Sequence, residues 1–141
     1  MPRINWRRAL LGGIVAGVVW GTLYAPLHPL VEVHDSLGRP VLPITPFRGA
    51  TLVMRVLVVI NGFVQGITTL WLYAAIRPRF GPGPKTAAIA GFAVWLLVSW
   101  VHITWAAFTG VRPTAILSPL AANLPLVLLA GLAGAWLYKE E

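Results

Sequence analysis

The chain has 141 residues, of which 57% are hydrophobic and 11% are charged, whereas soluble domains carry about 25% charged residues. A water-soluble fold of this length has too little interior to bury so many apolar side chains, so the composition predicts an integral membrane protein. Eleven basic and four acidic residues give a net charge of +7. The cations cluster at the ends of apolar runs, which is typical of membrane topology and excludes nucleic acid as a partner. The absence of cysteine excludes disulfides, thiolate metal sites and cysteine catalysis.

Four apolar stretches have the length of about 20 residues that a helix needs to cross a bilayer. We predict spans at 9–30, 55–76, 86–109 and 115–138, within a single membrane domain that covers 1–141. Prolines near the end of the first span are expected to kink or terminate it. Two prolines in the first half of the fourth span predict a bend that neighbouring helices can accommodate.

The connections between the spans predict an all-α fold, an antiparallel up-down four-helix bundle. A short basic loop at 77–85, with the sequence RPRFGPGPK, joins the second and third spans and forces them to be antiparallel neighbours. The connection between the first two spans is longer and forms an outer loop at 31–48. A turn-like segment at 35–38 fits a small β-hairpin there, although Pro40 and Pro43 interrupt its second arm.

The distribution of cations predicts that the N- and C-termini are both cytoplasmic. This orientation places more Lys and Arg on the inside than on the outside, as the positive-inside rule requires. The inner set is Arg3, Arg7, Arg8, Arg77, Arg79, Lys85 and Lys139, and the outer set is Arg39, Arg48, Arg55 and Arg112.

Glycines recur at intervals of four residues on the first two spans. They are Gly13, Gly17 and Gly21 on the first, and Gly62 and Gly66 on the second. Small-residue faces of this kind allow helix backbones to approach closely in a membrane. The pattern favours packing within the bundle, and it also fits homo-oligomerisation or docking against another membrane protein.

Polar residues inside the spans form a layer in the outer half of the membrane. The layer contains Asn61 and Gln65 on the second span, Ser99 and His102 on the third, and Asn123 on the fourth. Counting inward from the outer ends of the spans, at 1.5 Å per residue, places the layer about 10 Å deep. Each group needs a hydrogen-bond partner at that depth. The layer therefore either bonds the helices together or lines a ligand site.

His102 is a titratable side chain deep within a span, and such residues are candidates for function. We expect a neutral imidazole that is hydrogen-bonded to Asn61 or Ser99. Haem ligation would need a second axial ligand, for which His28 is the candidate. We expect no cofactor.

The outer loop contains two imidazoles and two carboxylates within eight residues, namely His28, Glu32, His34 and Asp35. Zinc and other divalent cations take ligands of these types. The spacing matches none of the usual short metal motifs, so we expect a solvated loop without a metal ion.

The tripeptide Trp71-Leu72-Tyr73 recurs as Trp136-Leu137-Tyr138. Such a recurrence fits either duplicated hairpins or the common placement of aromatic residues at a membrane interface. The stretches WLYAAIRPRFGPGPK (71–85) and GAWLYKE (134–140) resemble a group of short, uncharacterised bacterial membrane proteins. This resemblance implies four spans in the bacterial cytoplasmic (inner) membrane and no established activity, and it assigns no functional residues.

The sequence lacks a phosphate-binding glycine loop, a nucleophile elbow and paired carboxylates within the spans. We therefore predict a non-enzymatic protein, an accessory or self-associating helix-packing protein whose partners are the lipid bilayer and another membrane protein or a second copy. One alternative is a small-molecule carrier or binder that uses the polar layer. The other alternative is a haem- or metal-dependent membrane redox protein.

Overall fold

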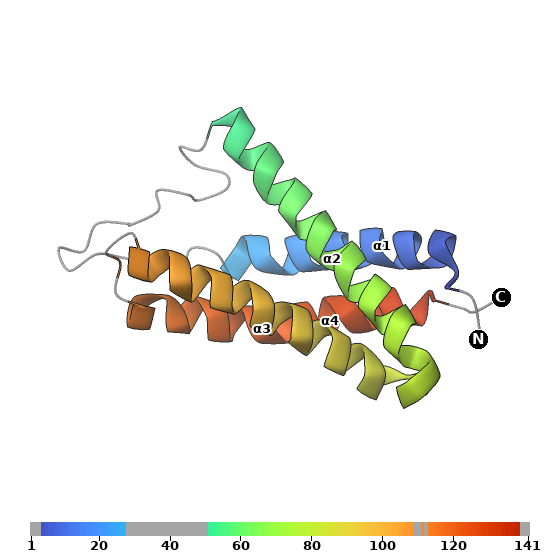
Figure 1. Cartoon of the computed structure of the whole chain (residues 1–141). Coiled ribbons are helices and arrows are strands. Elements are labelled where there is room, and N and C mark those ends of the chain that lie inside the picture. Colours follow the sequence, from blue (N-terminus) through green and yellow to red (C-terminus); the bar gives the residue numbers. More distant parts are fainter. Residues whose placement is uncertain (1–3, 28–50, 109–110, 112, 139–141) are drawn as a thin grey trace.

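The computed structural model describes residues 4–27, 51–108, 111 and 113–138, and within these ranges it is helical and contains no strand (Figure 1). The helices are α1 (Trp6–Leu27), α2 (Leu52–Phe80), α3 (Pro84–Phe108) and α4 (Leu117–Trp136), and a short 3-10 turn, η2 (Pro113–Ile116), precedes α4. Each of the four α-helices is long and apolar enough to cross a membrane. The described part of the chain is therefore all-α and has the helices of a multi-pass membrane protein. The predicted outer loop at 31–48 and its hairpin lie outside the described residues.

The first two helices begin at polar residues that cap them. The Asn5 side-chain oxygen accepts a hydrogen bond from the Arg8 backbone N–H at 3.0 Å. The Thr51 hydroxyl accepts one from the Met54 N–H at 3.3 Å. Each cap satisfies one of the N–H groups that the first turn of a helix leaves without an intrahelical partner.

The connection between α2 and α3 is shorter than the predicted loop at 77–85. Helix α2 continues through Pro78 and ends at Phe80, and the N–H of the capping residue Gly81 donates to the Arg77 carbonyl at 2.8 Å. Gly81 has φ 82° and ψ 164°, a conformation that is essentially restricted to glycine. Helix α3 then starts at Pro84, because the fixed φ of proline suits a first helical position. The turn itself is limited to residues 81–83.

Helices α2 and α4 are central to the bundle, because each contacts both α1 and α3. The described parts of α1 and α3 do not touch each other. Helices α1 and α4 lie side by side, and α2 crosses them at a steep angle (Figure 1). The start of α1, the end of α2, the start of α3 and the end of α4 all lie at one end of the molecule, on the right of Figure 1. We refer to this end as the turn end.

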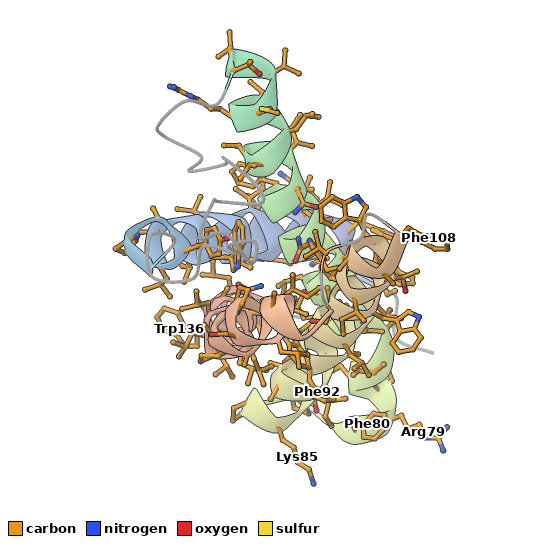
Figure 2. The ribbon with its side chains drawn as sticks, turned by 90° about the vertical axis from the view of Figure 1, so that its left-hand side faces the viewer. Arg79, Phe80, Lys85, Phe92, Phe108 and Trp136 are labelled. Carbon is orange, nitrogen blue, oxygen red and sulfur yellow. The ribbon has the colours of Figure 1, made fainter. Side chains whose placement is uncertain are left out.

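The core is built mainly from small side chains and two tyrosines. The buried cluster comprises Ala9, Ala16, Leu70, Tyr73, Ala74, Ala87, Ala90, Ala130 and Tyr138. Large apolar side chains lie on the outside, and Figure 2 shows Phe92, Phe108 and Trp136 pointing away from the bundle. This distribution suits a bilayer, where packing depends on close backbone approach and lipid covers the apolar exterior.

The first part of α2 projects away from the other helices (Figure 1). Leu52 is 77% exposed and Leu57 is 58% exposed, and from Leu52 to Asn61 no residue of the helix is buried. The first buried residue is Gly62. Helix α2 therefore joins the bundle only through its second part, from Gly62 onward.

Candidate functional site

Asn123 is the member of the predicted polar layer that bonds two helices together. Its side-chain oxygen on α4 accepts a hydrogen bond of 2.8 Å from the indole N–H of Trp20 on α1. The Trp20 ring also stacks on Tyr24, with 4.8 Å between the ring centroids. Trp20 had no place in the predicted layer. Its indole N–H was the signal, because a donor inside a membrane span requires a partner.

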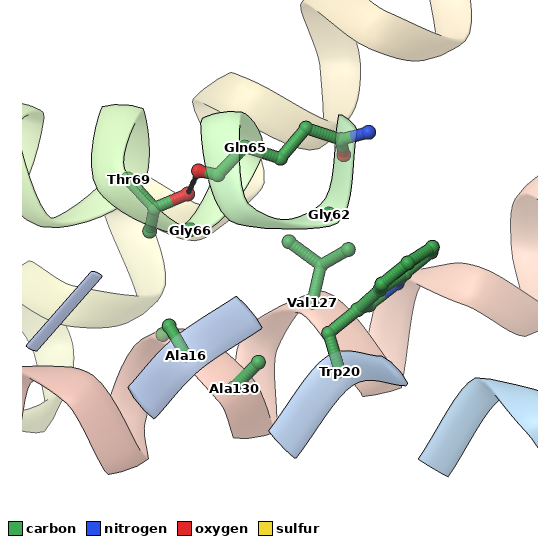
Figure 3. Close-up of a pocket in the computed structure, with 9 residues that line it drawn as sticks. Ala16, Trp20, Gly62, Gln65, Gly66, Thr69, Val127 and Ala130 are labelled. Carbon is green, nitrogen blue, oxygen red and sulfur yellow. Dashed lines mark hydrogen bonds between the residues drawn. The ribbon is translucent and has the colours of Figure 1, made fainter. Parts of the chain in front are cut away.

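Gln65 lines a small cavity between α1, α2 and α4 (Figure 3). The cavity has a volume of about 20 Å³, close to what one water molecule needs. Its other lining residues are Ala16, Trp20, Gly62, Gly66, Thr69, Val127, Ala130 and Gly131. The Thr69 hydroxyl is already bonded to the Gln65 backbone carbonyl at 2.8 Å. In Figure 3 the Gln65 side chain runs along α2 and not toward Val127. The cavity walls are thus mostly apolar, and the space is too small for a metabolite.

The remaining members of the layer are not brought together. Asn61 is exposed on the projecting part of α2, and no hydrogen bond joins its amide to another residue in the described ranges. Ser99 is buried on α3, and among the described residues its hydroxyl has no hydrogen-bond partner. The layer is therefore spread over separate environments within the described helices.

His102 is exposed on α3, and its Nδ1 lies 2.7 Å from the Val98 carbonyl of its own helix. This bond replaces the predicted one to Asn61 or Ser99. A carbonyl only accepts hydrogen bonds, so in the neutral ring Nδ1 carries the proton and Nε2 keeps its lone pair. In that tautomer Nε2 is a hydrogen-bond acceptor.

The predicted glycine faces meet at the interface of α1 and α2. A Cβ atom at Gly13 would lie 2.8 Å from Ile67 Cγ1, and one at Gly17 would lie 2.8 Å from Phe63 Cδ1. A Cβ at Gly66 would overlap the Gly13 carbonyl, and one at Gly62 would touch the Trp20 ring at 3.0 Å. A Cβ built on Gly21 would have no atom of another described helix within 4 Å, so that glycine takes no part in the contact between α1 and α2.

A second close contact between glycines joins α1 to α4. A Cβ atom at Gly12 would lie 2.7 Å from the Gly134 carbonyl oxygen, and one at Gly134 would lie 2.5 Å from the Gly12 carbonyl oxygen. The four-residue spacing of glycines in the sequence did not indicate this pair. Gly12 directly precedes Gly13, so α1 presents glycine to α2 on one side and to α4 on the other.

A group of polar and aromatic residues lies at the turn end. The Tyr138 hydroxyl accepts a hydrogen bond from the Asn5 backbone N–H at 3.2 Å, and the Tyr138 ring meets Tyr73 edge to face at 5.8 Å. The Tyr73 hydroxyl accepts a bond from the Gly83 N–H at 3.4 Å. The Arg77 guanidinium lies over the Tyr138 ring, 5.4 Å from its centroid, a cation–π distance. We call these five residues the tyrosine cluster.

The tyrosine cluster joins all four helices at one point. Its signal in the sequence was the recurring Trp-Leu-Tyr, because Tyr73 and Tyr138 are the last residues of the two copies and meet in the structure. These contacts connect two backbone N–H groups to two phenol hydroxyls and place a guanidinium over an aromatic ring. The cluster therefore fixes the ends of helices.

In the part of the chain that the structure describes, no three His, Cys, Asp or Glu side chains come together in a way that could hold a metal ion. The loop candidates His28, Glu32, His34 and Asp35 lie outside that part. His28 was also the candidate second haem ligand, so that prediction stays a prediction.

Comparison with known proteins adds no family to these observations. No family model, no curated protein and no solved structure matches the chain.

Proposed function

We propose that the protein is a small, non-enzymatic, multi-pass membrane protein that acts by helix packing and self-associates through the projecting part of α2. The four apolar helices support the membrane setting. The observation that carries the proposal is Asn61, an exposed amide within the apolar projecting part of a helix.

The topology we propose is an antiparallel up-down bundle in the bacterial cytoplasmic membrane with both termini inside. Order of contact supports the antiparallel part, because Gly13 and Gly17 of α1 lie against Ile67 and Phe63 of α2. The cations near the turn end support its cytoplasmic placement. The resemblance of residues 71–85 and 134–140 to short bacterial four-span proteins supports the bacterial setting.

An unpaired amide in the hydrocarbon core costs several kcal/mol of lost hydrogen bonding. Asn61 has this cost in a single copy surrounded by lipid, because no described residue bonds to it. A second copy removes the cost, since a carboxamide carries both a donor and an acceptor and can form two reciprocal bonds across a two-fold axis. Interhelical bonds of this kind contribute about 0.6–2 kcal/mol in membranes.

The apolar residues around Asn61 provide the rest of the proposed contact. Val53 is 67% exposed, and Leu57 and Ile60 are also exposed on this part of α2. Their side chains would pack between two copies while the amides bond. An accessory role, in which another membrane protein covers the same surface, is the competing outcome of the test.

The test is the change Asn61→Leu, which removes the amide and keeps an apolar surface. We expect self-association to weaken by about threefold to thirtyfold, the equivalent of the bond energy above. Förster transfer between donor- and acceptor-labelled chains in vesicles, measured over a range of protein-to-lipid ratios, gives the dissociation constant.

Thr104→Leu is the matched control, because Thr104 is also an exposed polar residue on a spanning helix but its hydroxyl is bonded to the Trp100 carbonyl at 2.9 Å. This variant should associate as the unchanged chain does. Transfer that is equal for the unchanged chain and Asn61→Leu would refute self-association through α2. A monomeric unchanged chain that co-purifies with another membrane protein, and loses it on Asn61→Leu, would replace self-association by the accessory role.

A further inference from the structure

The turn end carries a group of cations from three helices. Arg7 and Arg8 lie in the first turn of α1, Arg77 and Arg79 in the last turn of α2, and Lys85 in the first turn of α3. No Asp or Glu occurs among the residues that the structure describes. Glu140 and Glu141 follow α4 in sequence and lie outside the described residues.

Two of these cations stand beside a turn whose shape is held by hydrogen bonds. The Thr86 hydroxyl donates to the Gly81 carbonyl at 2.7 Å, and the Gly83 N–H donates to the Tyr73 hydroxyl. Arg79 and Lys85 lie on either side of this turn and are exposed. Figure 2 shows both side chains pointing away from the bundle, with Phe80 between them on the same edge. The turn therefore presents two cations from fixed backbone positions.

The two cations beside the turn lie at opposite kinds of helix end: Arg79 is in the last turn of α2, where the helix carries a partial negative charge, and Lys85 is in the first turn of α3. Helices α1 and α3 both start here, and neither has an acidic residue in its first turn. The N-terminus of a helix carries a partial positive charge, so Lys85 adds to that charge instead of compensating it. An anion from outside the described chain is the group that would relieve this arrangement.

Exposed aromatic side chains place the same end at the level of lipid headgroups. Trp6 is 64% exposed and Trp136 is 85% exposed, and both belong to the turn end. Phe80, next to Arg79, is 55% exposed. Tryptophan is enriched where hydrocarbon meets headgroups, so the cations next to these rings are level with the phosphates. A lipid is the anion that offers both an apolar chain for Phe80 and a charge for Arg79 and Lys85.

We propose that Arg79 and Lys85, on either side of the α2–α3 turn, form a binding site for the headgroup of an anionic phospholipid. The site is independent of self-association through α2, because the two lie at opposite ends of that helix. It also differs from general attraction to a charged leaflet, because it assigns the selectivity to two residues on one turn.

The experiment titrates phosphatidylglycerol or phosphatidylcholine onto the purified full chain in detergent and measures bound lipid by native mass spectrometry. The unchanged chain should prefer phosphatidylglycerol. Each basic residue near a membrane surface contributes about fivefold to the binding of anionic lipid, so R79Q/K85Q should weaken phosphatidylglycerol binding by about thirtyfold. Phosphatidylcholine binding should stay the same.

Two further variants separate a site from a loss of charge or of folding. Arg55→Gln removes one cation near the other end of α2 and should leave phosphatidylglycerol binding unchanged. R79K/K85R keeps both charges and should retain phosphatidylglycerol binding. If circular dichroism shows that R79Q/K85Q folds poorly, R79K/K85R still tests whether the positive charges are sufficient for binding. Glycerol phosphate, added in millimolar excess, should not displace the lipid.

Three results would overturn the proposal. The first is equal affinity of the unchanged chain for both lipids. The second is an equal loss of phosphatidylglycerol binding in Arg55→Gln and in R79Q/K85Q. The third is full displacement by glycerol phosphate, which would assign the cations to a free phosphate ligand.

Discussion

Gly66 lies where the backbones of α1 and α2 are in close contact. A Cβ atom there would overlap the Gly13 carbonyl and would lie 2.8 Å from the Gly17 backbone nitrogen. Both neighbours are backbone atoms, so neither can rotate out of the way as a flexible side chain could. One added methyl group must therefore push two helices apart.

Gly66→Ala should accordingly lower the stability of the bundle by about 1–3 kcal/mol, the usual cost of overpacking an interior. Gly21→Ala is the matched control on α1, because no atom lies within 4 Å of its Cβ. That change should be neutral or stabilise the helix by up to about 1 kcal/mol, because alanine is the better helix former. Unfolding by titration with sodium dodecyl sulfate, followed by circular dichroism, gives both free energies. Equal stabilities of the two variants would contradict the close α1–α2 contact.

The turn between α2 and α3 depends on the conformation of one glycine. Gly81 has φ 82° and ψ 164°, and a Cβ atom there would meet no other atom within 4 Å. Any cost of a side chain at this position is therefore conformational and not steric crowding by neighbours.

Gly81→Ala should lower the stability by about 1–3 kcal/mol, because non-glycine residues rarely adopt this conformation. Pro82→Ala, at an exposed position of the same turn, should change stability much less. Thermal melts of both variants in detergent, monitored at 222 nm, measure the difference. A Gly81→Ala variant as stable as the unchanged chain would show that the turn does not need this backbone shape.

Length and hydropathy were sufficient to predict the four helices, but the sequence could not indicate which face of each helix is buried. In a soluble helix the apolar face identifies the core, whereas here Leu57 of α2 faces outward and Leu70 of the same helix is fully buried. Lipid and protein interior are both apolar, so the hydrophobic pattern does not distinguish them. The glycine spacing was the more informative signal, although it also included Gly21, which has open space around it.

The candidate site was predictable in its residue types and not in its connections. The predicted polar layer included Asn123, but its partner Trp20 could not be chosen without knowing that α1 and α4 are neighbours. The residue at which α2 ends was not predicted from the sequence, and the reason is local. Pro78 favours a stop just before it, yet the last turn of a helix tolerates a proline when the following residues complete the cap.

At the scale of the molecule, the turn end carries most of the described cations. The side of the membrane on which this end lies sets the topology of the whole chain. We expect a periplasm-active reporter, such as alkaline phosphatase, to be inactive when fused after residue 141 and active when fused after residue 50. The reason is that Lys and Arg next to a span resist translocation. Matched expression levels of the two fusions are the control. High activity of the fusion after residue 141 would reverse the orientation.

The hydrogen bond between Asn5 and Tyr138 also limits the order of assembly. Its two residues are 133 positions apart, and it joins the residue that caps α1 to the residue that follows α4. During synthesis α1 enters the membrane long before Tyr138 has been added to the chain. The hydrogen bond at the start of α1 can therefore form only after the other three helices have been synthesised. The packing of this end of α1 against the end of α4 is thus a late step of biogenesis.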